Sequence, residues 1–369
     1  MQRNPFHPGD LRHEEMIDRE EELARLDALI EGGDWCRLVA PRRYGKTLLL
    51  RRALANAEAR GDAGVLVDLE GVLSMASIVV RIERAYAAAL RGRLRQAVES
   101  FFRSWNLGLS LSGAGFAATL QANPRTDAET VLLRLLETPQ RLHERSGTRT
   151  VVVFDEFQDL LRVEAADGVL RSVIQHQHGT ATYVFAGSAP SMMERLFSDP
   201  SRPLLEQALP LQLGPLPLDA VIDSVIERFA RTRRDPGDAV GLLVDFTRGH
   251  PQRTMLLAHH LWELTPRGSV ADEGAWFEAL ERALRDTRAA LAARYESLPV
   301  NEQRVALALA SGPGSVYEEA TYGPVGLKRG SIRFALDALE GRGEVIRTPL
   351  GPVLTDPLLE HWLRERGPL

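Results

Sequence analysis

Cysteine, lysine and long apolar runs are scarce in this chain of 369 residues, and each scarcity excludes something. Cys36 is the single cysteine, so no internal disulfide can form, as is usual in a reducing cytoplasm. No apolar stretch reaches the roughly 20 residues that a membrane-spanning helix needs. Residues 1–8 lack the charged and then apolar layout of a secretory signal. We therefore expect a cytoplasmic protein with no membrane partner.

Basic charge is not in excess either, because the formal net charge is -5. A general electrostatic attraction to nucleic acid is therefore excluded, and any such contact must be local. Fixed-period repeats and low-complexity tracts are absent as well. The length exceeds that of one typical domain, so two or three domains are expected.

A phosphate-binding loop is the strongest motif that is present. Residues 40–47 read Ala40, Pro41, Arg42, Arg43, Tyr44, Gly45, Lys46 and Thr47, directly after a short apolar strand. The pattern G-x-x-x-x-G-K-S/T is complete except that Ala40 stands where the first glycine belongs. Gly45 lets the backbone approach phosphate, Lys46 adds a positive charge, and the Thr47 hydroxyl can hold Mg²⁺. Leu48 lies in the first turn of a helix whose positive end faces the same anion.

The use of lysine supports this interpretation. Lys46 is one of only two lysines, the other being Lys328, while arginine is common. Ala40 carries a Cβ and tolerates positive φ poorly, so the anion nest must come from residues 44–46. Guanine-specific proteins commonly use an Asn-Lys-x-Asp motif, which this chain lacks, so ATP and ADP are the favoured nucleotides. The alternative is an accidental Gly-Lys-Thr at a helix start.

An acidic pair follows the most apolar strand of the sequence. The run 150–154 has no polar alternation, which predicts a parallel strand buried on both faces. Asp155 and Glu156 follow at its carboxyl end, where ligands bind in open α/β sheets. Asp155 can support Mg²⁺, and Glu156 can orient or deprotonate the water that attacks the γ-phosphate. Alone, such a pair is equally a solvated strand end; together with residues 45–47 it predicts an Mg·ATP site.

The order of elements predicts an α/β protein. Strands alternate with helices over the first 215 residues, which indicates a parallel sheet with right-handed crossovers. The expected strands are 36–39, 65–69, 150–154, 182–186 and 208–213, the last at the sheet edge. Single helices are expected over 77–105 and 127–143. After the proline-rich stretch 210–217 the pattern is helical to about residue 294, and a third unit of helices and a short β-ribbon follows from residue 298. We predict a P-loop domain (1–215), an α-helical lid (216–295) and a winged-helix domain (296–369).

Several segments together carry a family resemblance. They are Phe6-His7-Pro8-Gly9, residues 17–23, residues 40–47, Asp155-Glu156-Phe157, Gly187-Ser188 and Gly249-His250-Pro251. With them the chain resembles the archaeal-type AAA+ ATPases, relatives of the STAND signalling ATPases and of Orc-type initiators. The resemblance covers most of the chain and implies an ATPase with a parallel-sheet P-loop domain, a helical lid and a C-terminal winged helix. It also implies Mg²⁺ as the metal.

The resemblance implies further roles near the nucleotide. Ser188 matches sensor 1, a polar group beside the γ-phosphate, and Arg253 matches sensor 2, which reaches that phosphate from the lid. Pro251 begins the lid helix that packs against adenine. Asp18 and Arg19 match the N-terminal segment beside the same base. Helix capping and solvated charge are the alternative interpretations of these residues.

One departure concerns hydrolysis. Relatives often carry Pro-Leu-x-Gly-Arg before the edge strand, whereas residues 203–207 here end in Gln207. An arginine finger supplied to a neighbouring subunit speeds hydrolysis by orders of magnitude. Arg195 or Arg202 could replace it. The substitution favours a slow switch over ring-type cooperative hydrolysis.

The C-terminal unit offers a candidate surface for double-stranded DNA. Helices followed by a short ribbon resemble a winged helix, with residues 328–339 as the recognition helix. Its candidate phosphate contacts are Lys328, Arg329, Arg333 and, on the wing, Arg347. Neighbouring acids oppose this role, and winged helices also serve as protein contacts.

A hairpin expected over 107–120, with Trp105 and Phe116 as anchors, is a second candidate contact for a protein partner, a neighbouring subunit or the core.

These observations predict an ATPase that hydrolyses ATP slowly and moves its lid and winged helix as a nucleotide-controlled switch. Two alternatives stay open. One is a nucleotide-regulated DNA-binding or scaffold module with negligible turnover. The other is a loader or adaptor whose target is another protein, including a second copy of the chain.

Overall fold

A computed structural model describes residues 3–8, 16–105, 127–311, 326, 328–348 and 351–366. The chain forms two compact units. We call Arg19–Ala40 with Lys46–Leu213 the sheet unit, and Met1–Asp18, Pro41–Gly45 and Gly214–Leu369 the helical unit. The division of the C-terminal part into lid and winged helix stays a prediction, because one apolar core runs through both.

The sheet unit is built on five parallel strands in the order β2-β3-β4-β1-β5. They are β1 (Cys36–Val39), β2 (Ala63–Asp68), β3 (Thr150–Asp155), β4 (Ala181–Gly187) and β5 (Leu209–Gln212). Every residue of β3 and β4 is buried, which is why their sequences are apolar without alternation. The parallel α/β sheet and the edge position of β5 are confirmed.

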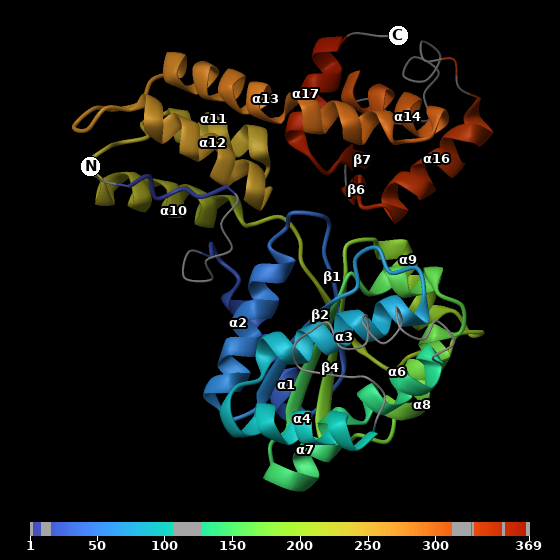
Figure 1. Cartoon of the computed structure of the whole chain (residues 1–369). Helices are drawn as coiled ribbons and strands as arrows, with labels where there is room; N and C mark the ends of the chain where they lie inside the picture. The colour runs from blue at the N-terminus through green and yellow to red at the C-terminus, as the bar shows by residue number, and fades with distance from the viewer. Residues whose placement is uncertain are drawn as a thin grey trace. The chain divides into compact units, whose positions relative to one another are not determined.

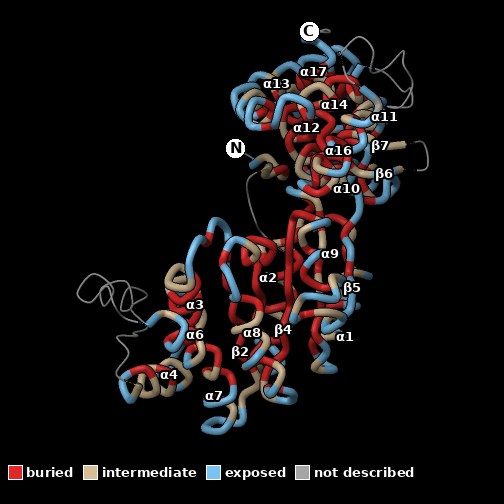
Figure 2. Tube along the Cα trace, turned by 90° about the vertical axis from the view of Figure 1, so that its right-hand side faces the viewer, coloured by how far each residue is buried: buried red, intermediate tan, exposed pale blue. Residues whose placement is uncertain are grey.

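Helices cover this sheet, and Figure 2 shows β2 and β4 buried among them. They are α1 (Glu20–Gly32), α2 (Lys46–Ala59), α3 (Met75–Ala89), α4 (Gly92–Trp105), α6 (Ala128–Leu136), α7 (Thr138–Ser146), η2 (Phe157–Arg162), α8 (Ala166–Ile174) and α9 (Pro190–Ser198). Helix α1 packs on α2, α3 on α6, and α4 on α7.

Two helix predictions were wrong in the same way. The single helix expected over 77–105 is divided into α3 and α4, because Leu90 is extended (ψ 139) and Gly92 has a positive φ of 53. The helix expected over 127–143 is likewise divided into α6 and α7 at Glu137. The prediction followed apolar periodicity and gave no weight to Gly92 or to Pro139, which stands in the first turn of α7.

The helical unit holds the remaining elements, labelled in Figure 1. They are α10 (Leu218–Arg231), α11 (Ala239–Thr247), α12 (Pro251–Leu264), α13 (Glu273–Glu296), α14 (Val300–Ser311), α16 (Arg329–Gly341), β6 (Val345–Thr348), β7 (Gly351–Leu354) and α17 (Pro357–Arg366). Strands β6 and β7 form an antiparallel ribbon, with Val345 opposite Leu354. Helices α14 and α16 with this ribbon are the elements of a winged helix. Within the described residues, no helix has the length and apolar character needed to cross a membrane.

Candidate nucleotide site

Within the sheet unit, the structure brings Lys46 and Thr47 together with the acidic pair Asp155 and Glu156. Helix α2 begins at Lys46, whose Nζ lies 2.6 Å from Asp155 Oδ1 and 2.5 Å from Glu156 Oε1. The Thr47 hydroxyl donates to Asp155 Oδ2 at 3.2 Å. Lys46 and Asp155 are both largely buried, so their attraction is only weakly screened by solvent. Residues more than a hundred positions apart therefore share one cluster at the carboxyl end of β3.

The loop before this helix adopts the conformation that its sequence requires. Gly45 has a φ of 85, and a Cβ there would meet no neighbouring atom, so glycine is needed for the backbone angle alone. Arg43 is also left-handed, with a φ of 68. Ala40 is not among the residues with positive φ; it is buried, and its N–H donates to Gly187 O at 3.2 Å. The missing first glycine therefore costs the backbone nothing in this conformation.

Glu156 is held from several directions. Its backbone is left-handed (φ 51, ψ 42), an uncommon state for a residue with a side chain, and its N–H donates to Asp155 Oδ1 at 2.9 Å. Oε2 accepts from Ser188 Oγ at 2.6 Å and from Gln158 Nε2 at 2.5 Å. Burial works to raise the pKa of Glu156, but Lys46 and these two donors outweigh it and lower the pKa. Gln158 was missed by sequence reasoning, because it stands among other polar residues, with Glu156 before it and Asp159 after it.

The donors present fit a magnesium ion. Mg²⁺ binds oxygen and usually takes one or two protein ligands, with phosphates and water completing its shell. The Thr47 hydroxyl and the Asp155 carboxylate lie side by side and supply such oxygens. Lys46 faces two carboxylates, so the cluster holds one more negative than positive charge, which favours a cation.

Arg253, the sensor 2 candidate, lies in the helical unit and is 1% exposed. Its Nε and Nη2 donate to Asp356 Oδ1 at 2.8 Å and Oδ2 at 2.5 Å. Arg294 also donates to Asp356 Oδ2, at 2.9 Å, and pairs with Glu344 at 2.6 Å. Arg253 therefore closes a buried ion-pair network in this structure. Asp356 was missed, because nothing in the sequence links it to a residue a hundred positions earlier.

His250 and Pro251 begin helix α12. Pro251 is its first residue, and His250 Nδ1 accepts from the Arg253 backbone N–H at 3.3 Å. Burial lowers the pKa of His250 to about 3, so the ring is neutral near pH 7. Loop residues 41–45 group with this unit; the Tyr44 ring centroid lies 5.0 Å from that of His250.

The other sequence candidates are distributed as follows. Asp18 and Arg19 fall in different units, and Arg19 Nη1 pairs with Glu22 at 2.6 Å. Arg202 pairs with Asp167 at 3.1 Å within its own chain, which leaves it poorly suited to reach another subunit. Arg195 is exposed in the last turn of α9.

The predicted DNA-contacting residues are only partly available. Lys328 and Arg333 are exposed on or beside α16, which begins at Arg329. Arg347, however, lies 2.7 Å from Glu340 and 3.7 Å from Asp337, so its charge is already paired. The structure thus places the basic residue of strand β6 against two of the acids that the sequence analysis had weighed against DNA binding.

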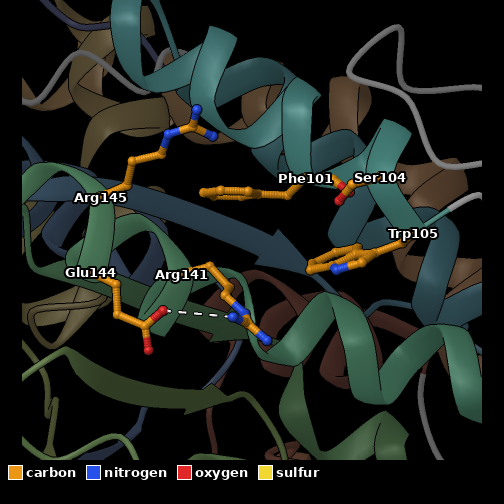
Figure 3. Close-up of a pocket in the computed structure, with 6 residues that line it drawn as sticks. All are labelled: Phe101, Ser104, Trp105, Arg141, Glu144 and Arg145. Atoms are coloured by element: carbon orange, nitrogen blue, oxygen red, sulfur yellow. Dashed lines mark hydrogen bonds and ion pairs between the residues drawn. The ribbon is translucent and has the colours of Figure 1, made fainter.

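A separate hollow of about 500 Å³ lies between α4 and α7 (Figure 3). The ring centroids of Phe101 and Trp105 lie 6.4 Å apart, and the Arg145 guanidinium carbon lies 5.5 Å from the Phe101 ring centroid. Arg141 pairs with Glu144 at the rim, at 3.7 Å. The predicted hairpin 107–120 lies outside the described residues, so its contact role stays a prediction.

Comparisons with known proteins agree with this architecture. No family model and no curated protein matches the sequence. The Walker-type ATPase PABY2304 of Pyrococcus abyssi is similar in structure, with 18% identity, 96% and 98% coverage of this chain and of that one, and a TM-score of 0.70. The ORC2 protein of Aeropyrum pernix (ADPNP-ADP complexes) is 17% identical, with 95% and 93% coverage and a TM-score of 0.57. At these identities the likeness concerns the fold, which is that of the archaeal-type AAA+ ATPases.

Proposed function

We propose that this protein binds Mg·ATP through the cluster at the start of α2 and the end of β3, and hydrolyses it slowly. One observation carries the proposal: Lys46 lies between Asp155 and Glu156 beside the Thr47 hydroxyl. A lysine, a hydroxyl and two carboxylates at a helix start are what a phosphate-binding site with a metal requires. The AAA+ fold supports this chemistry by analogy.

Each residue of the cluster has a distinct role in the proposed mechanism. Lys46 binds the outer phosphates. Thr47 and Asp155 would hold Mg²⁺, and that ion would supply positive charge against the phosphates. Glu156 orients a water and takes its proton as the oxygen bonds to the γ-phosphorus. The bond from that phosphorus to the bridging oxygen breaks, and ADP leaves with the electron pair. Ser188 is proposed as the polar group beside the γ-phosphate.

The contacts of Glu156 and Arg253 support the proposal of slow turnover. Both Glu156 oxygens accept hydrogen bonds, one from Lys46, so the carboxylate becomes available only when phosphate draws that lysine away. Arg253 is occupied by Asp356 and must leave it before it can sense a phosphate. We propose that breaking this ion pair is the nucleotide-controlled step that repositions the lid and winged helix. Asp18, Arg19 and Pro251 are proposed beside adenine.

The two lysines of the chain provide the test. Lys46→Ala should weaken Mg-dependent binding of a fluorescent ATP analogue by about 100-fold or more, a loss of roughly 3 kcal/mol, as a charge-assisted contact to phosphate is removed. Lys328→Ala removes the same charge from an exposed position and should leave binding unchanged. Equal affinity of Lys46→Ala and the parent protein would overturn the proposal.

A switch with negligible turnover is the second candidate, favoured by Gln207 where relatives often carry arginine. Its partner could be double-stranded DNA, contacted through Lys328 and Arg333 on the recognition helix, with Arg347 already paired to acids. Arg333→Ala should then weaken binding of a DNA duplex and reduce its salt dependence. Binding that does not respond to salt would exclude this partner and favour a protein or a second copy. Localisation in the cytoplasm remains a prediction from the sequence.

A further inference from the structure

We infer that Gln158 is a positioning residue that keeps the Glu156 carboxylate aimed once Lys46 has left it. The inference rests on the proposed function, and it adds a residue that neither the motif nor the fold assigns. Gln158 lies on the 3-10 turn η2, two residues after Glu156, and it is 5% exposed. A buried amide beside a reactive carboxylate needs a reason, because an unbonded polar group is costly there.

The hydrogen bond to Glu156 identifies the NH₂ group of the Gln158 amide as the donor. An ionised carboxylate only accepts hydrogen bonds, so the Gln158 amide must face Glu156 with its NH₂ group. That nitrogen lies 2.5 Å from Glu156 Oε2, and Ser188 Oγ donates to the same oxygen at 2.6 Å. Two neutral donors thus hold one oxygen while Lys46 holds the other. Removal of the lysine by phosphate leaves the two neutral donors in place.

Strand β4 makes room for this arrangement. A Cβ on Gly187 would lie 2.5 Å from Gln158 Oε1 and 2.5 Å from Met193 Cγ and Sδ. Gly187 does not have a positive φ, so glycine is required here for space and not for backbone angle. The next residue is Ser188, which supplies the second donor. The end of one strand therefore provides both a hydrogen bond to Glu156 and the space through which Gln158 reaches it.

Gln158 Oε1 is buried and has no hydrogen-bond partner among the described residues. If Gln158 served only to fill space, an apolar side chain would avoid this unsatisfied oxygen. Within the described part of the chain, Gln158 Oε1 is left without a partner because the NH₂ group of the same amide is directed at Glu156. Among those residues, one end of the amide is bonded and the other is not, which favours a positioning role over simple packing.

The test compares Gln158→Met with the parent protein. Methionine is unbranched and of similar length but has no N–H donor. We expect ATP affinity within about threefold of the parent, and a single-turnover hydrolysis rate lower by about 10- to 100-fold, part of the 10²–10⁴-fold that a general base contributes. Gln158→Asn, which retains the amide but is one methylene shorter, should lose a similar amount.

Gln177 offers a matched control in the same unit. It is also buried, and its amide bonds to Leu136 O and Tyr183 Oη. Gln177→Met should lower the melting temperature without slowing hydrolysis in the folded protein. In a Glu156→Gln background, Gln158→Met should cause no further loss, because the group that it positions is already gone.

The outcomes separate this inference from the proposed function. A parent protein that does not bind Mg·ATP overturns the proposed function, and one that binds without hydrolysing overturns both hydrolysis and this inference. If the parent turns over and Gln158→Met hydrolyses at the same rate, only the inference is wrong. It is also wrong if the variant loses affinity, stability and rate together, or slows the Glu156→Gln background equally.

Discussion

The two units bury charge in opposite ways, and the sheet unit leaves its charge unbalanced. Lys46 faces two carboxylates at the end of β3, Asp155 and Glu156, so negative charge exceeds positive. The cluster also includes a left-handed Glu156, which is uncommon for a residue with a side chain. Unbalanced charge and local strain are retained where a ligand completes the site.

The helical unit pairs its less exposed charges two against two. Arg253 and Arg294 face Asp356 and Glu344, and the exposed Arg43 adds a third cation 3.9 Å from Asp356. Asp356 also accepts the backbone N–H of Leu358 at the start of α17. Burial works to raise the pKa of Asp356, but Arg253 and the other cations outweigh it and hold the pKa well below its usual range. This difference supports the proposal that the first cluster binds a cation and phosphate, whereas the second cluster holds elements of the helical unit together.

The largest expected effect breaks the first cluster chemically. Glu156→Gln keeps the shape of the side chain but removes the base, so the hydrolysis rate should fall by about 10²- to 10⁴-fold. ATP binding should persist, because Lys46, Thr47 and Asp155 are unchanged. Single-turnover assays and a binding titration measure both quantities. Glu99→Gln, on α4, is the control, and full activity of Glu156→Gln would remove this residue from the mechanism.

The next effect breaks the second cluster. Asp356→Asn leaves the buried Arg253 and the half-buried Arg294 without their shared carboxylate, which should reduce the free energy of unfolding of the helical unit by about 3–5 kcal/mol. Urea unfolding followed by tryptophan fluorescence would measure the change. Asp337→Asn, an exposed carboxylate on α16, should change stability by less than about 0.5 kcal/mol. A loss below 1 kcal/mol for Asp356→Asn would show that the network contributes little.

A smaller effect concerns acid stability. Because burial lowers the pKa of His250 from 6.5 to about 3, the unfolded chain binds more protons than the folded one between these values. The contribution of His250 to the free energy of unfolding is therefore fully present above pH 6.5. It falls by up to about 1.4 kcal/mol for each pH unit below that value. His250→Asn keeps a side-chain cap but does not titrate, so the slope between pH 6.5 and 4.5 should decrease. An unchanged slope would contradict the prediction.

The smallest effect separates the two candidate arginine fingers. Arg202→Ala breaks a partly buried pair with Asp167 and should cost about 1 kcal/mol of stability. Arg195→Ala should cost less than about 0.5 kcal/mol, because the side chain is exposed. If hydrolysis rises with protein concentration, only Arg195→Ala should remove that rise. The reverse result would favour Arg202 as the residue that reaches a neighbouring copy.

The sequence by itself determined the parallel sheet and the residues of its phosphate loop. Buried parallel strands require continuous apolar runs such as 150–154, and the proposed phosphate-binding helix start depends on Gly45 and Lys46. Both requirements concern residues that are adjacent in the sequence, so a short stretch of sequence is enough to predict them. The breaks at Leu90 and Glu137 were not predicted, because apolar periodicity alone does not mark where a helix turns against its neighbours.

Only the tertiary structure decided which distant side chains share a contact. Gln158 reaches Glu156 because Gly187 leaves space for it, and Arg253 is held by Asp356 although 103 positions separate them. Hydrogen bonds and ion pairs depend on distances of a few ångströms, which chain folding sets and residue spacing does not record. The sequence therefore named the groups that we propose to act on ATP, and the folded chain showed which other side chains each of them contacts.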